Sequence, residues 1–314
     1  MAQGQQSSLL RSLQMESSRE TLDRFLLVSF AIIIAMLSFA LTRVPAHLAF
    51  SLCANLVLSA IGFFAAKSAL QSPELHEMFL KADLKGIDLN KATTKRDANG
   101  ALVRPIEGVP IPESQGTIAA VVYILVLSVF IPFAFAGYVG RAVLDDFPHQ
   151  QLSEYLAAML SVGLAAFMGF ADDVLDLRWR HKIPLPFLAN LPLVLVYLAS
   201  GGATGVSVPN PLRWLLGSYI ELHFLFFFAL LLVAVFSTHA INILAGVNGL
   251  EVGQAVVVAA AVCCLNVFQL ARSTSDEYTR HHVQSLVLIL PFLATSLALL
   301  RANWFPSKVF AGDT

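Results

Sequence analysis

Acidic and basic residues stand close together at the end of an apolar segment near the middle of the chain. The segment reads Phe170-Ala171-Asp172-Asp173-Val174-Leu175-Asp176-Leu177-Arg178-Trp179-Arg180-His181-Lys182. Helical spacing places Asp172 and Asp176 on one face of a helix. Carboxylates in such a cluster can bind a hard divalent cation or take a proton from an attacking group, and Lys182 can hold phosphate oxygens.

The same cluster has a plainer explanation. Charges at a helix end follow the positive-inside rule without any chemistry, and this explanation suits Arg178 and Arg180 equally well. It suits Asp172 and Asp173 less well, because carboxylates beside an apolar run are costly at membrane depth and tend to mark polar sites or pathways. We therefore predict a functional role for these two aspartates.

A second segment mixes amides, glycines and one acid. It reads Asn242-Ile243-Leu244-Ala245-Gly246-Val247-Asn248-Gly249-Leu250-Glu251. Glycine lets a backbone approach a ligand closely, and asparagine offers an oxygen to a metal and both donors and acceptors to a nucleobase. Helix packing through small residues explains the pattern equally well. We expect a kinked helix that enters a loop.

Two further carboxylates lie beside apolar runs. Glu113 precedes one run, within Ile111-Pro112-Glu113-Ser114-Gln115-Gly116, and Asp313 follows another, within Gly312-Asp313-Thr314. An acid at a helix amino terminus also stabilises the helix dipole, and an aspartate in a terminal segment is ordinarily solvated. Neither residue identifies a site by itself.

The elements that must position these residues are membrane helices. Of the 314 residues, 57% are hydrophobic and only 13% are charged, and the mean hydropathy is +0.71, whereas soluble domains are about a quarter charged. A run of about 17 to 25 apolar residues can cross a bilayer. About eight such runs are present, at 25–41, 48–66, 117–137, 156–171, 184–200, 219–238, 253–271 and 283–300. The predicted fold class is all-α, a polytopic transmembrane helix bundle.

Other classes of protein are disfavoured by charge and by cysteine placement. The net charge of −1 provides no basic field for a nucleic acid. Cys53, Cys263 and Cys264 all lie inside apolar runs, without the spacing of a disulfide framework or a zinc site.

The distribution of Lys and Arg orients the predicted spans. If the chain crosses at every run, fifteen of the twenty Lys and Arg fall on one side, which the positive-inside rule makes cytoplasmic. Residues 1–24 then form a cytoplasmic tail, and residues 25–314 form one membrane domain with a polar cytoplasmic connection at about 67–115. The four segments above fall on this same face, although only the count of Lys and Arg, and not the chemistry of these segments, was used to orient the chain. This coincidence predicts one cytoplasmic site.

Taken in order, four segments resemble the family of UDP-N-acetylglucosamine dolichyl-phosphate N-acetylglucosaminephosphotransferases, within the polyprenyl-phosphate N-acetylhexosamine-1-phosphate transferase superfamily. They are Pro112 to Gly116, Phe170 to Lys182, Asn242 to Glu251 and Phe310 to Thr314, and the resemblance covers nearly everything from about residue 48 onward. It implies an enzyme of the endoplasmic reticulum membrane whose active site faces the cytoplasm. Such an enzyme transfers N-acetylglucosamine 1-phosphate from UDP-N-acetylglucosamine to dolichyl phosphate and releases UMP, the first step of the dolichol-linked pathway for protein N-glycosylation.

The resemblance also implies Mg²⁺ as cofactor, the lipid bilayer as surroundings, and a homodimer or an association with the next glycosyltransferase of the pathway. Carried over by position, it places Asp172, Asp173 and Lys182 at the catalytic centre, and Asn242 and Asp313 on the metal. The residues that it implies around uridine and diphosphate are Leu89, Glu113, Gly246, Asn248 and Phe310, with Asn248 at the uracil edge and Phe310 stacked on the base. Which aspartate acts as a base, if either does, stays open, because a phosphate monoester is already largely ionised at neutral pH.

The chain departs from the family pattern in three ways. Asp176 stands where relatives often carry Asn, and the first apolar run looks like an added amino-terminal helix compared with the animal members of the family. Family members continue past Thr314 with further membrane helices and a loop whose Arg and His grip the sugar and diphosphate, so we expect this chain to be carboxy-terminally incomplete. The alternatives left open are an inactive truncated form that binds a partner, a secondary transporter, and a bacterial-type transferase that uses undecaprenyl phosphate.

Overall fold

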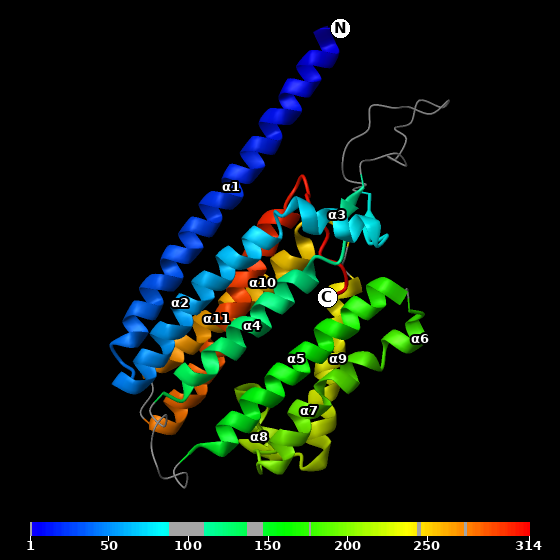
Figure 1. Ribbon diagram of the computed structural model, residues 1–314. Coiled ribbons are helices and arrows are strands. Elements are labelled where there is room, and N and C mark those ends of the chain that lie inside the picture. The colour runs from blue at the N-terminus through cyan, green and yellow to red at the C-terminus, as the bar shows by residue number, and fades with distance from the viewer. Residues whose placement is uncertain (1, 88–109, 137–146, 176, 244–245, 273–274) are drawn as a thin grey trace. The chain divides into compact units, whose positions relative to one another are not determined.

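The computed structural model describes residues 2–87, 110–136, 147–175, 177–243, 246–272 and 275–314 (Figure 1). Within these residues, eight helices are long and apolar enough to cross a membrane. They cover Glu16–Phe39, Ala46–Ala69, Gly116–Ala134, His149–Leu175, Trp179–Ala199, Phe224–Ile241, Leu250–Arg272 and Glu277–Asn303. The predicted all-α bundle with about eight spans is confirmed.

The first helix differs most from its predicted bounds. Helix α1 runs from Ala2 to Leu41, so the residues predicted as a tail are helical and the candidate span begins at Glu16 rather than at residue 25. Residues 5–24 are rich in Gln, Ser, Leu, Arg and Glu, most of which have good helix propensity. The helix therefore extends beyond its apolar part, which hydropathy alone cannot report.

The chain forms two compact units, of which the first comprises Met1–Gly140 and Ala245–Gly312. Its remaining helices are α2 (Ala46–Ala69), α3 (Pro73–Lys81), α4 (Gly116–Ala134), α10 (Leu250–Arg272) and α11 (Asp276–Asn303). Helix α11 packs against α2, α4 and α10 (Figure 1), and it is the most buried of the eight candidate spans. It forms the centre of this unit.

A short hairpin carries the polar connection of the first unit back to the membrane helices. Strand β1 (Lys85–Gly86) pairs antiparallel with β2 (Ile111–Pro112). The carboxy-terminal segment runs beside β2, since the Phe310 N–H donates to Pro112 O at 2.8 Å and the Gln115 N–H donates to Phe310 O at 3.0 Å. Backbone hydrogen bonds thus hold Phe310 next to the start of α4.

The second unit comprises Arg141–Leu244 together with Asp313 and Thr314. Its helices are α5 (His149–Leu175), α6 (Trp179–Lys182), α7 (Leu185–Ala199), α8 (Arg213–Leu216) and α9 (Phe224–Ile243), with a 3₁₀ turn η2 (Asn210–Leu212) and a hairpin of β3 (Gly205–Ser207) and β4 (Tyr219–Glu221). Helix α7 packs between α5 and α9. Val194, Phe227 and Leu231 form its apolar core.

Candidate active site

The paired aspartates lie in the last turn of α5. Asp172 is only 6% exposed, and its Oδ1 accepts a hydrogen bond from the Leu177 N–H at 3.2 Å. The carboxyl end of a helix carries partial negative charge, which disfavours a carboxylate there. Helix stability therefore does not explain these acids, and an ionised carboxylate buried there needs a nearby cation to offset the cost of desolvation.

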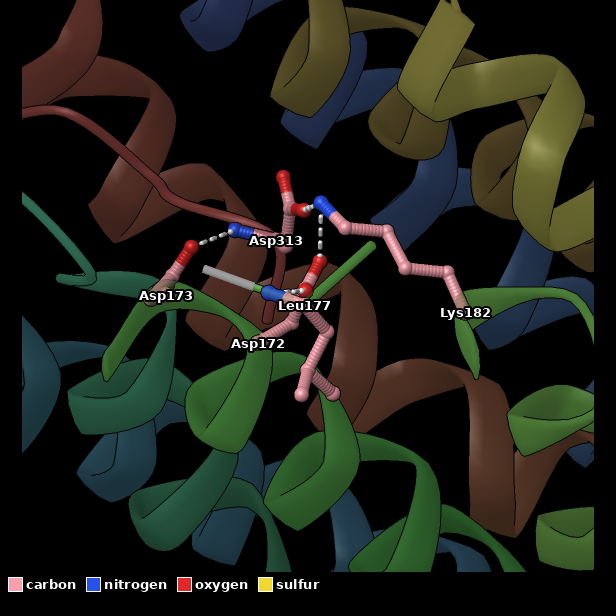
Figure 2. A network of polar contacts seen from close by, with 5 residues as sticks. All are labelled: Asp172, Asp173, Leu177, Lys182 and Asp313. Carbon is pink, nitrogen blue, oxygen red and sulfur yellow. Dashed lines mark hydrogen bonds and ion pairs between the residues drawn. The ribbon is translucent and has the colours of Figure 1, made fainter. Parts of the chain in front are cut away.

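Lys182 supplies that cation. Residue Arg178 is extended and begins the one-turn helix α6, in which the His181 N–H donates to Arg178 O at 2.8 Å. This turn directs the Lys182 side chain back toward the end of α5. Its Nζ lies 2.6 Å from Asp172 Oδ2 and 3.5 Å from Asp313 Oδ2 (Figure 2).

Asp313 reaches this group through its backbone as well as its carboxylate. Its N–H donates to Asp173 Oδ1 at 2.9 Å (Figure 2). Gly169, one turn earlier on α5, permits the approach, because a Cβ there would overlap the backbone of Asp313. Asp172, Asp173, Lys182 and Asp313 thus form one group, which we call the carboxylate–lysine cluster.

The sequence prediction missed Gly169. The available signal was a small residue three and four positions before Asp172 and Asp173, which is the spacing of one helix face. A glycine there lets another backbone lie against the helix.

The donors in the carboxylate–lysine cluster fit a hard cation. Oxygens of Asp172 and Asp313 converge on one positive charge, here the Lys182 ammonium, and carboxylate oxygens are the ligands that Mg²⁺ prefers. Among the described residues, no group of three or more His, Cys, Asp or Glu could hold a metal. Asn242, the other predicted ligand, lies in α9, but its side chain is outside the described part of the chain, as is Asp176.

Two of the predicted uridine residues lie together in the first unit. A Cβ on Gly86 would lie 2.8 Å from the Phe310 ring and 3.5 Å from Glu113 Oε2, so both side chains lie beside this glycine. Both residues are half-buried. Leu89, three residues after Gly86, lies outside the described residues. Glycine at position 86 leaves room for the aromatic ring, a role that the sequence prediction did not assign.

Gly246 and Asn248 lie in the turn between α9 and α10, as the predicted helix-to-loop transition requires. Gly246 has a φ of 112°, which favours glycine, and its N–H donates to Glu251 Oε1 at 3.0 Å. Asn248 is half-buried. The bounds of these elements support the expected loop and leave the base-binding role of Asn248 a prediction.

Asn303, at the end of α11, connects this turn to the carboxy-terminal segment. Its Oδ1 accepts the Gly249 N–H at 2.9 Å, and its Nδ2 donates to Val309 O at 2.9 Å. The side chain is 2% exposed. Asn303 thus positions the backbone next to Phe310. An asparagine directly after an apolar run was the signal that the sequence prediction did not use.

The part of the chain that carries these polar groups matches a known protein family. The family model described as Glycosyl transferase family 4 matches residues 155–314. The chain belongs to this family. The matched residues of the chain include the whole carboxylate–lysine cluster and the turn that carries Asn248. The family resemblance inferred from the sequence is confirmed.

Three relatives in the same family match most of the chain. A Schizosaccharomyces pombe protein is 37% identical over 278 residues, covering 84% of this chain and 59% of the relative. A Dictyostelium discoideum protein is 39% identical, with coverages of 81% and 62%, and a Saccharomyces cerevisiae protein is 35% identical, with coverages of 92% and 64%. Each bears the name UDP-N-acetylglucosamine--dolichyl-phosphate N-acetylglucosaminephosphotransferase. The chain spans about three-fifths of the length of these relatives.

Proposed function

We propose that this chain transfers N-acetylglucosamine 1-phosphate from UDP-N-acetylglucosamine to dolichyl phosphate on the cytoplasmic face of the endoplasmic reticulum membrane, and releases UMP. The observation that carries the proposal is the carboxylate–lysine cluster at the ends of candidate membrane spans. The names of the three relatives supply the substrates. Membership of a transferase family also favours this activity over the secondary transporter.

In the proposed reaction an oxygen of the lipid phosphate attacks the β-phosphorus of the nucleotide sugar. The bond from that phosphorus to the oxygen of UMP breaks, and UMP leaves with the electron pair. The attacking phosphate needs no strong base, since the second pKa of a phosphate monoester is about 6. The chain's own contribution is then positioning and charge stabilisation, which account for most catalysis of phosphoryl transfer.

Lys182 is the residue best suited to orient the reacting phosphates. It is 23% exposed, so its ammonium can reach a ligand, while the ion pair with the buried Asp172 fixes the side chain. A fixed ammonium costs no rearrangement when charge develops on the phosphate oxygens. Asp172 then acts as the residue that positions Lys182.

The remaining predicted residues complete the proposal. Asn242 and Asp313 would hold Mg²⁺, which when bound neutralises charge on the diphosphate. Phe310 would stack on the uracil ring, with Glu113 beside it at Gly86, and Asn248 would read the uracil edge. Leu89 and Gly246 would line the same pocket.

The proposal is tested by measuring UMP release from UDP-N-acetylglucosamine by the purified chain with dolichyl phosphate, with and without Mg²⁺. We expect Mg²⁺-dependent release, and a fall of about 100-fold in Lys182→Met, the size of loss seen when one preorganised donor is removed. Lys81→Met is the matched control, since Lys81 makes an exposed ion pair with Glu77 on α3. A version extended with the carboxy-terminal region of a relative is assayed in parallel.

The outcomes separate the alternatives. If only the extended version releases UMP, the result would support the alternative in which this chain is inactive and binds a partner. Equal rates in wild type and Lys182→Met, or release that needs undecaprenyl rather than dolichyl phosphate, would contradict the proposal. Flux of substrate across sealed vesicles without release of UMP would instead support the transporter.

A further inference from the structure

A cavity of about 520 Å³ in the first unit is lined by charged side chains that the proposed reaction does not use. Arg19 and Asp23 of α1, His76 of α3, Arg301 of α11 and Lys308 of the carboxy-terminal segment all line it. Among these side chains, the three cations Arg19, Arg301 and Lys308 face one carboxylate, Asp23. The cavity therefore carries a net charge of about +2, which is the charge that a phosphate monoester would balance.

The two arginines are held in place by the protein itself. Arg19 Nη2 donates to Pro306 O at 3.3 Å, and Arg301 Nη2 pairs with Asp23 Oδ2 at 3.1 Å. A guanidinium has five N–H donors, so one such contact fixes each side chain and leaves donors for an anion. Binding a phosphate would then require little further ordering of these arginines.

Lys308 adds a third cation to the same cavity. Its backbone N–H donates to Ala302 O at 3.0 Å, which holds the residue against the end of α11. Across the part of the chain that the structure describes, Lys308 has no carboxylate partner within ion-pair distance. Asp23 therefore neutralises only part of the positive charge.

The cavity lies where membrane-spanning helices end. The candidate spans of α2 and α11 end at Ala69 and Asn303, and the cavity is lined by Leu70 and Gln71 after the first and by Arg301 and Ala302 in the last turn of the second. This is the level of lipid head groups in a bilayer. Basic cavities between helices at that level bind anionic head groups.

Apolar residues line the same cavity. Leu22 of α1, Leu70 and Ala302 are among its lining residues. A wall that combines leucines with arginines suits an amphipathic ligand better than a free ion. The position and the lining together favour a lipid over a soluble phosphate.

We propose that this cavity binds the phosphate group of an anionic membrane lipid. The lipid bridges α1 to the end of α11, where Trp304 Nε1 also donates to Ser18 Oγ of α1 at 3.0 Å. The phosphate contacts Arg19, Arg301 and Lys308, and the acyl chains extend along the membrane-facing side. This site does not depend on the transferase activity.

The test compares the full 314-residue chain in nanodiscs of phosphatidylcholine with and without phosphatidic acid. We expect phosphatidic acid to be retained in native mass spectrometry and to raise the Tm by a few degrees, because a ligand that binds only the folded state stabilises it. The double variant Arg19→Gln with Lys308→Gln is expected to weaken retention about tenfold. The matched control, Arg24→Gln with Lys81→Gln, removes the same charge from exposed side chains outside the cavity and should behave as wild type.

A second variant tests the proposal even if the double variant does not fold, because its expected effect is tighter rather than weaker binding. Among the described residues that line the cavity, Asp23 is the only carboxylate, so Asp23→Asn should tighten binding of phosphatidic acid. The proposal is overturned if the Arg19 and Lys308 double variant and Asp23→Asn both bind the lipid as wild type does. It is also overturned if the Arg24 and Lys81 control weakens binding as much as the Arg19 and Lys308 double variant. Equal stabilisation by soluble glycerol 3-phosphate, lost in the Arg19 and Lys308 double variant, would overturn the membrane lipid as the source of the phosphate.

Discussion

Burial of an ionised carboxylate at the end of a membrane helix is costly without a positive charge nearby, and Lys182 places an ammonium beside Asp172. The 2.6 Å separation of Lys182 Nζ and Asp172 Oδ2 makes the bond short and charge-assisted. Such pairs add little net stability, because desolvation opposes attraction. The stability of the fold alone therefore does not explain the pair, which agrees with the proposed role of Lys182 at a bound phosphate.

Removal of one partner from this pair should cost more than removal of both. Lys182→Met leaves the Asp172 carboxylate buried without its cation, and we expect a loss of about 3 kcal/mol in the free energy of unfolding. Asp172→Asn combined with Lys182→Met should restore much of this stability while UMP release stays low. Thermal unfolding in detergent measures both effects. If the double variant is no more stable than Lys182→Met, the two side chains are not coupled as the structure indicates.

Phe310 allows a test of base binding that is separate from the chemical step. Stacking of a base on an aromatic ring contributes about 1–3 kcal/mol, so Phe310→Leu should raise the KM for UDP-N-acetylglucosamine about tenfold and change kcat less. Phe310→Tyr should restore the KM. The control is Phe305→Leu, an apolar side chain that is 36% exposed in the same segment. A fall in kcat with an unchanged KM would contradict a stacking role.

At the scale of elements, the carboxylate–lysine cluster depends on how closely the backbone of Asp313 approaches α5. Gly169 provides the space, since any Cβ would meet the backbone of Asp313. Glycine within a helix costs about 1 kcal/mol relative to alanine. Helix α5 therefore carries a residue of low helix propensity at the point where the backbone of Asp313 comes close. The contacts of Asp313 with Asp173 and Lys182 follow from that close approach.

Gly169→Ala should separate helix stability from activity. The alanine favours the helix but displaces Asp313, so we expect UMP release to fall at least tenfold with little loss of thermal stability. Gly253→Ala on α10 is the matched control, because a Cβ there meets only Leu300 Cδ1 at 3.8 Å, an ordinary contact. UMP release is measured for both variants. Equal activity in the two would show that the close approach of Asp313 to α5 is not required for UMP release.

At the scale of the whole molecule, the sequence predicted the spans well because each needs a long apolar run, which is visible locally. It predicted Asp172, Asp173 and Lys182 as parts of a site from their residue types at a helix end, and Asp313 by resemblance. The structure brings these four residues together. The support from Gly169 and Asn303 was missed, because it depends on contacts between segments far apart in the chain. Hydropathy carries no information about such contacts.

Orientation in the membrane is the prediction that belongs to the whole chain. Helix α11 has 28 residues and is about 42 Å long at 1.5 Å per residue, so its two ends lie on opposite sides of a bilayer. Arg301 near its carboxyl end lines the same cavity as Leu70 and His76, which places the α3 connection on the side of that end. The excess of Lys and Arg in the 67–115 connection predicts that this side is cytoplasmic.

Cysteine labelling in sealed microsomes tests that orientation. With Cys53, Cys263 and Cys264 replaced by alanine, a membrane-impermeant maleimide should label Glu74→Cys on α3 without detergent. It should label Glu277→Cys, at the start of α11, only after the membrane is dissolved. Both positions are exposed in the folded chain, so burial cannot account for a difference between them. The reverse pattern would place the ends of α2 and α11 in the lumen and would contradict the orientation that the positive-inside rule predicts for these helices.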